Sequence, residues 1–77
     1  MKIRILNVVD GCYYNICDCE YQLNTFQVEI NSFFTFENKK YKVLNIERDL
    51  HYIRKSNELK CTKLEIYVEE IKKYEKV

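Results

Sequence analysis

The single glycine of the chain, Gly11, constrains the fold more than any other residue. It follows Asp10 and stands between two apolar runs, and Asp-Gly in that position is typical of a two-residue hairpin turn with positive φ at both residues. This turn predicts an antiparallel pair in which Val9 faces Cys12, Val8 faces Tyr13, Ile5 faces Ile16 and Ile3 faces Asp18. In that register one face carries a core stripe of apolar side chains: Ile3, Ile5, Val9, Cys12, Tyr14 and Ile16.

Alternation of apolar and polar residues continues beyond this hairpin and predicts further strands. Residues 25–31 alternate with Phe26, Val28 and Ile30 inward, and Ser32–Phe36 adds three phenylalanines. After a predicted four-residue loop at 37–40, residues 41–48 form a strand whose phase breaks, which indicates either a β-bulge near Val43 and Leu44 or two covered faces. Residues 49–58 read as a long loop or irregular edge. A last strand covers 59–68, with Leu64, Ile66 and Val68 in phase.

These patterns predict a mainly β fold, a small antiparallel barrel or rolled sheet of four to six strands, similar to SH3-like or OB-like barrels. Residues 69–77 add a possible short C-terminal helix, because Val68, Ile71 and Tyr74 have helical spacing. We expect one domain over residues 1–77. Small size and strands that are apolar on both faces favour a homodimer, in which a second copy covers one face.

Composition excludes several enzyme classes. With one glycine there is no glycine-rich phosphate loop, and with one histidine there is no His-x-x-x-His zinc protease motif. The lack of alanine and proline, with many Ile, Lys, Asn and Tyr residues, indicates a low-GC bacterial genome or one of its phages or mobile elements.

The beginning of the chain does not resemble a signal peptide, and no segment approaches a membrane span, so we expect a cytoplasmic protein without a membrane partner. In that compartment the four cysteines are expected to be reduced thiols.

A structural zinc site is the sharpest chemical hypothesis for these cysteines. It would use Cys12, Cys17 and Cys19 with Cys61 or His51 as the fourth ligand. The spacing lacks the usual paired knuckles, and the hairpin register places Cys12 on the opposite face from Cys17 and Cys19. The favoured interpretation is therefore that the cysteines are small hydrophobic residues in strands and that no metal or other cofactor is bound.

Catalysis has little support in the sequence, and we expect a protein that is not an enzyme. A cysteine with His51 as base lacks an orienting third residue. The carboxylate pairs Asp18/Glu20 and Glu47/Asp49 share strand faces, as an acid–base pair would need, but a solvated strand face has the same spacing.

Nucleic-acid binding is a weaker alternative than protein binding. The net charge is +1, with two basic against five acidic residues in 1–37 and eleven against seven in 38–77. Tyrosines interleave with basic residues in the second half, as on sheets that stack single-stranded bases, yet acidic residues there oppose counterion release. The basic residues concerned are Lys39, Lys40, Lys42, Arg54, Lys55, Lys60 and Lys63.

The favoured function is a non-enzymatic protein–protein interaction module, since tyrosine-rich surfaces give contact area at low entropic cost. For a small protein of a phage or mobile element, we expect a role that binds and inhibits a host protein such as a defence nuclease. That expectation rests on class-level plausibility alone. The expected partner-binding residues are Tyr13, Tyr21, Lys39, Lys40, Lys42, Arg54 and Lys55.

Overall fold

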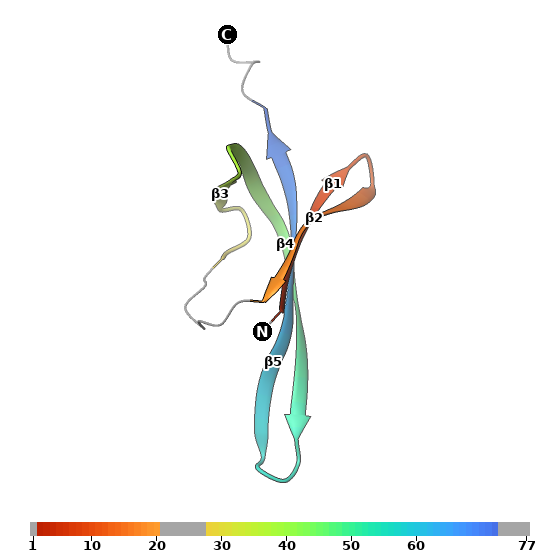
Figure 1. Cartoon of the computed structure of the whole chain (residues 1–77), viewed down its shortest axis with the longest axis vertical. Helices are drawn as coiled ribbons and strands as arrows, with labels where there is room; N and C mark the ends of the chain where they lie inside the picture. Colours follow the sequence, from red (N-terminus) through yellow and green to blue (C-terminus); the bar gives the residue numbers. More distant parts are fainter. Residues whose placement is uncertain (1, 21–27, 73–77) are drawn as a thin grey trace.

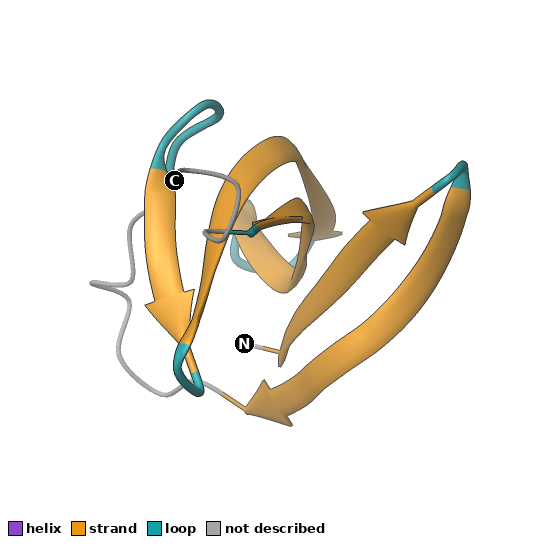
Figure 2. Ribbon diagram, turned by 90° about the horizontal axis from the view of Figure 1, so that it is seen from above, coloured by secondary structure: helices purple, strands orange, loops and turns teal. Residues whose placement is uncertain are grey.

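A computed structural model of the chain describes residues 2–20 and 28–72, and every regular element within them is a strand. The five strands form one curled sheet, a half-barrel (Figures 1 and 2). Their bounds are β1 Lys2–Val9, β2 Cys12–Glu20, β3 Phe33–Phe36, β4 Lys39–Ile53 and β5 Glu58–Ile71. The prediction of a mainly β rolled sheet with four to six strands is confirmed.

The strand order is β2-β1-β5-β4-β3, so the last long strand of the sequence lies at the centre of the sheet. Strand β5 pairs antiparallel with β4 and parallel with β1. The sequence predicted an antiparallel sheet, and the parallel pair of β1 with β5 differs from that prediction. The pair is parallel because β5 follows the β3–β4 and β4–β5 hairpins before it joins β1. The sheet does not close, and β2 and β3 are its two edges.

The predicted Asp10-Gly11 hairpin is confirmed at its turn, where φ is 51° at Asp10 and 80° at Gly11. The predicted pairs Val9–Cys12 and Val8–Tyr13 are present. Farther along, the register shifts between Ile5 and Leu6, so Ile5 faces Cys17 and not Ile16, and Ile3 faces Cys19 and not Asp18. A bulge in β2 causes this shift, because it inserts one unpaired residue and reverses the alternation beyond it.

The core lies on the concave side of the half-barrel and is centred on β5. The alternating residues Leu64, Ile66 and Val68 are buried there as predicted. The core stripe predicted for the first hairpin is only partly correct: Ile3 and Ile5 are buried and Ile16 packs against them, whereas Val9, Cys12 and Tyr14 are exposed. Among residues 2–20 and 28–72, the buried core residues are Ile3, Ile5, Tyr41, Val43, Leu64, Ile66 and Val68.

Strand β4 confirms the phase break expected near Val43 and Leu44. The register with β5 shifts between Val43 and Asn45, which leaves Leu44 as the extra residue of a bulge. The predicted loop at 37–40 is shorter in the structure, since only Glu37 and Asn38 form the turn, with φ values of 51° and 68°.

Two other predicted segments differ from the structure. Val28 packs against the core as expected, but residues 28–30 are not a strand and Ile30 is exposed; residues 25–27 lie outside the described residues. The predicted C-terminal helix is wrong over Glu69–Ile71, which extend β5 because they pair with β4 residues 40–42. The rest of that prediction, at 73–77, lies outside the described residues.

Candidate functional site

Strands β4 and β5 continue together beyond the rest of the sheet and form a two-stranded arm (Figure 1). The first described residue of β1, Lys2, pairs with Lys63. Among the described residues, the part of β5 that precedes Lys63 therefore has only β4 beside it. Residues 50–53 pair with 58–61, and a turn at 54–57 joins them. The long loop or irregular edge predicted for 49–58 is therefore correct only at the turn of residues 54–57, and a paired ribbon stands in place of the rest.

One face of the arm carries four apolar or weakly polar side chains. Leu50 lies opposite Cys61, and Tyr52 lies opposite Leu59. Residues at i and i+2 share a strand face, and directly opposed residues share the same face of the sheet. Leu50, Tyr52, Leu59 and Cys61 therefore form one continuous surface, which we call the arm face.

The arm face is open to solvent. Leu50 is 57%, Tyr52 50% and Leu59 64% exposed, while Cys61 is half-buried. By alternation along β4, Leu50 and Tyr52 lie on the same side of the sheet as Ile46, which packs against the core. The arm face therefore extends the concave side of the sheet past the part that β1 covers.

A second bulge creates this arrangement. The register of β4 with β5 shifts between Asp49 and Leu50, where Thr62 becomes the extra residue. Without that shift, Leu59 and Cys61 would follow the alternation of Lys63 onto the outer face. The sequence contains a sign of this bulge, since Leu59 is out of phase with Leu64 and Ile66. The bulge was not predicted because residues 49–58 were expected to be a loop or irregular edge, which left Leu59 without a partner strand.

The turn at the end of the arm is basic and ordered by a side-chain contact. Arg54 and Lys55 lie in the turn, and the Tyr52 hydroxyl donates a hydrogen bond to Asn57 Oδ1. Asn57 has a positive φ of 57°, which asparagine tolerates better than most residues. This contact fixes the Tyr52 side chain on the arm face beside two cationic residues.

The basic residues expected to bind a partner do not form one surface. Lys39, Lys40 and Lys42 lie at the start of β4, and Lys40 Nζ is 5.5 Å from the centre of the Phe33 ring. Arg54 and Lys55 follow the other end of the same 15-residue strand. At about 3.3 Å per residue the two groups are roughly 40 Å apart along the strand.

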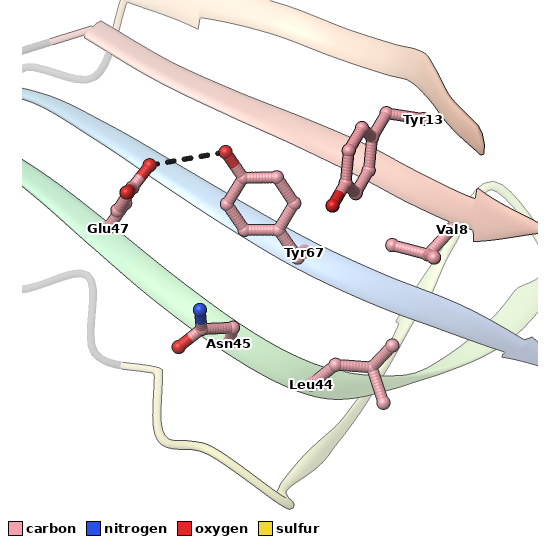
Figure 3. A pocket seen from close by; sticks show the side chains of 6 residues that line it. All are labelled: Val8, Tyr13, Leu44, Asn45, Glu47 and Tyr67. Carbon is pink, nitrogen blue, oxygen red and sulfur yellow. Dashed lines mark hydrogen bonds between the residues drawn. The ribbon is translucent and has the colours of Figure 1, made fainter. Parts of the chain in front are cut away.

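Of the two tyrosines expected to contact a partner, Tyr13 lies on the outer face of the sheet and Tyr21 lies outside the described residues. The Tyr13 ring meets that of Tyr67 edge to face, with 5.4 Å between ring centres. Figure 3 shows these two residues in a pocket that crosses β2, β1, β5 and β4. Its volume is about 320 Å³. The other lining residues are Val8, Leu44, Asn45 and Glu47.

Hydrogen bonds in this outer pocket join the Tyr67 hydroxyl to two carboxylates. The Tyr67 hydroxyl lies 3.2 Å from Glu47 Oε1 and 3.3 Å from Glu65 Oε1. Partial burial, followed by the negative charges of Glu65 and Glu47, raises the pKa of Tyr67 from 10.0 to about 12. The phenol therefore stays protonated at neutral pH and is a donor, not a nucleophile.

Two of the four carboxylates singled out from the sequence, Asp18 and Glu47, have side-chain partners in the structure. Arg4 Nη2 lies 3.0 Å from Asp18 Oδ2, and Arg4 Nη1 lies 3.8 Å from Glu65 Oε2. Lys63 Nζ contacts the same Glu65 oxygen at 3.4 Å. Asp18 and Glu47 thus take part in cross-strand contacts of the outer face, the kind of contact that stabilises a sheet.

The cysteines are arranged differently from the prediction. The β2 bulge returns Cys17 and Cys19 to the face of Ile5 and Ile3, which by alternation is also the face of Val9 and its partner Cys12. The register therefore does not place Cys12 on the opposite face. Within residues 2–20 and 28–72, no three His, Cys, Asp or Glu side chains gather as metal ligands.

Comparison of the chain with models of protein families, with curated proteins and with solved structures finds no match. None of the described residues forms a helix with the length and apolar character needed to cross a membrane. The arm face is the candidate functional site that the geometry singles out.

Proposed function

We propose that this chain is a non-enzymatic protein-binding module that contacts its partner through the arm face. The observation that carries the proposal is the exposure of Leu50, Tyr52 and Leu59 side by side on a projecting ribbon. Exposed apolar side chains that are contiguous mark interaction sites far more often than scattered ones do.

The physical argument is that an isolated two-stranded ribbon is at best marginally stable in water. The arm has no third strand and no covering layer among the described residues, and it nevertheless places its large apolar side chains on one face. A partner that covers this face stabilises the arm and removes apolar surface from water at the same time.

The chemistry of the arm also describes the partner. An apolar strip on the partner would meet Leu50, Tyr52 and Leu59, while nearby carboxylates would meet Arg54 and Lys55 at the turn. Tyrosine and arginine are enriched in the binding sites of protein interfaces, which suits this combination. The inhibitor role expected from the sequence belongs to this proposal if the arm covers a functional surface of the partner.

The test compares two faces of the same arm in affinity capture from a low-GC bacterial host lysate. Leu59→Ser and Leu50→Ser alter the arm face, and Ile53→Ser is the matched control, because Ile53 lies opposite Glu58 on the other face. The proposal predicts a stoichiometric protein captured by the unmodified chain and by Ile53→Ser but lost with the arm-face variants. Equal capture by all four proteins, or no stoichiometric partner, would refute it.

A further inference from the structure

The concave face holds a pair of thiols that the proposed function does not use. Cys17 and Cys19 are two residues apart on edge strand β2, opposite Ile5 and Ile3 respectively. Their Sγ atoms lie 3.9 Å apart, and both sulfurs are free thiols. Two thiols on one face of a strand can bind the same metal ion, which a single cysteine cannot do.

The separation of the sulfurs fits a metal ion. Metal–sulfur bonds of about 2.3 Å at a tetrahedral angle hold two thiolate sulfurs about 3.8 Å apart. The sulfurs of Cys17 and Cys19 already stand at 3.9 Å, so binding requires little rearrangement of β2. Thiolates select soft or borderline cations over Mg²⁺ or Ca²⁺.

The surroundings favour a divalent cation in particular. The two cysteines line a cavity of about 360 Å³ whose other walls are mostly apolar, with Phe34 and Phe36 from β3. A divalent cation with two thiolates forms a neutral unit, and a neutral unit is less costly to place against apolar side chains than a charged one. Cys19 is exposed, so water can reach the remaining coordination positions.

A metal ion at this pair competes with the proton of the Cys17 thiol. Burial, then the hydrogen bond with Cys19 and the negative charges nearby, raises the pKa of Cys17 above its ordinary value of 9.0. Metal binding requires the thiolate form, so a cation that binds this pair displaces thiol protons to solvent.

We infer that Cys17 and Cys19 of one chain bind a single divalent thiophilic cation of the Zn²⁺ class at the concave edge of the sheet. This site is distinct from the four-ligand zinc site considered from the sequence, because Cys12, Cys61 and His51 take no part in it. It is also independent of the arm face, since β2 and the arm do not pair.

The test is a titration of the full, reduced chain with Cd²⁺, followed by the ultraviolet thiolate-to-cadmium charge-transfer band. We expect saturation at about one equivalent, with release of protons to solvent as the thiolates bind Cd²⁺. Cys17→Ser and Cys19→Ser should each weaken binding by more than about 100-fold, because even outer-shell partners of a metal site contribute 10–100-fold. The double variant Cys12→Ser/Cys61→Ser is the matched control and should bind like the unmodified chain.

Several results would overturn the inference. They are absence of the band, binding that survives in Cys19→Ser, binding that is lost in the control, or saturation at half an equivalent. Cys19→Ser is the decisive variant because its side chain is exposed and the change leaves the core intact. Circular dichroism of each variant separates loss of the ligand from loss of the fold.

Discussion

Two aliphatic residues of β5 that lie on the same side of the sheet should differ sharply in their contribution to stability. Ile66 is 0% exposed at the centre of the sheet, whereas Leu59 is 64% exposed on the arm. We consider Ile66→Ala and Leu59→Ala, which remove similar side chains from the same strand. The comparison tests whether the arm face is a free surface or part of the core.

The expected magnitudes follow from burial. Replacing a fully buried Ile by Ala costs about 2–5 kcal/mol, which includes the cavity left behind. A fully buried Leu contributes about 1.5–3 kcal/mol to stability. Because Leu59 is only about one-third buried, Leu59→Ala should cost about 0.5–1 kcal/mol, and no cavity forms at an open site. The two variants should therefore differ by at least about 1 kcal/mol.

Urea unfolding followed by circular dichroism measures both costs, as shifts in midpoint at an unchanged slope. A chain of this size has a total stability of about 4–12 kcal/mol, so Ile66→Ala can leave too little folded protein. Ile66→Val, with an expected cost of about 0.5–1.5 kcal/mol, then replaces it. It is compared with Leu59→Val, which removes one methylene from a largely exposed site and should cost only about 0.3 kcal/mol. Equal costs for Ile66→Ala and Leu59→Ala would refute the assignment of Leu59 to an exposed surface. The same unfolding measurement at two protein concentrations shows whether a second copy of the chain covers the arm.

Two further predictions concern the turns and the outer face. Gly11→Ala should lower the free energy of unfolding by about 1–2 kcal/mol in urea, because φ is +80° at Gly11 although no atom lies within 4 Å of the added Cβ. Glu37→Asn should raise the free energy of unfolding, because φ is 51° at Glu37 and asparagine tolerates positive φ better. A change of the same sign in both variants would contradict the turn assignment. The raised pKa of Tyr67 contributes stability that is complete below pH 10.0 and is lost as pH rises through about 12. Tyr67→Phe should therefore reduce the loss of stability over this pH range. In a titration followed by phenolate absorbance, the variant should lack the tyrosine that ionises at the highest pH. If neither the stability profile nor the absorbance titration changed, Tyr67 would have an ordinary pKa.

Local signals in the sequence predicted the parts of the fold that depend on neighbouring residues. The Asp10-Gly11 pair determined the first turn because both residues adopt positive φ. The phase break at Val43 and Leu44 corresponded to a bulge, and the alternation of Leu64, Ile66 and Val68 corresponded to buried positions. In each case the pattern and its structural cause lie within a few residues.

The rest depends on contacts between distant segments, and local periodicity does not contain these. The parallel pairing of β1 with β5 joins Lys2 to Lys63, and nothing near either residue specifies it. The β2 bulge also escaped prediction, because the Asp10-Gly11 turn predicts a regular register. At the bulge the Cys17 N–H donates a hydrogen bond to Asn15 Oδ1, a contact that the alternation of residue types does not reveal. The same bulge brings Cys17 and Cys19 onto the core face.

The arm face was missed for a related reason. Leu50 and Tyr52 are separated by polar residues, and Leu59 is out of phase with the core of β5, so each half of the arm resembles a loop on its own. Only the pairing of the two halves, with a bulge at Thr62, brings their apolar side chains together.

The most direct test of protein binding through the arm face is photo-crosslinking from two neighbouring positions. A photoreactive phenylalanine analogue in place of Leu59 lies on the arm face, and the same analogue in place of Lys60 lies on the opposite face, where Lys60 pairs with His51. In host lysate we expect one strong crosslinked protein product from position 59 and little from position 60. Equal products from both positions, a product from position 60 alone, or none from either would contradict the proposal.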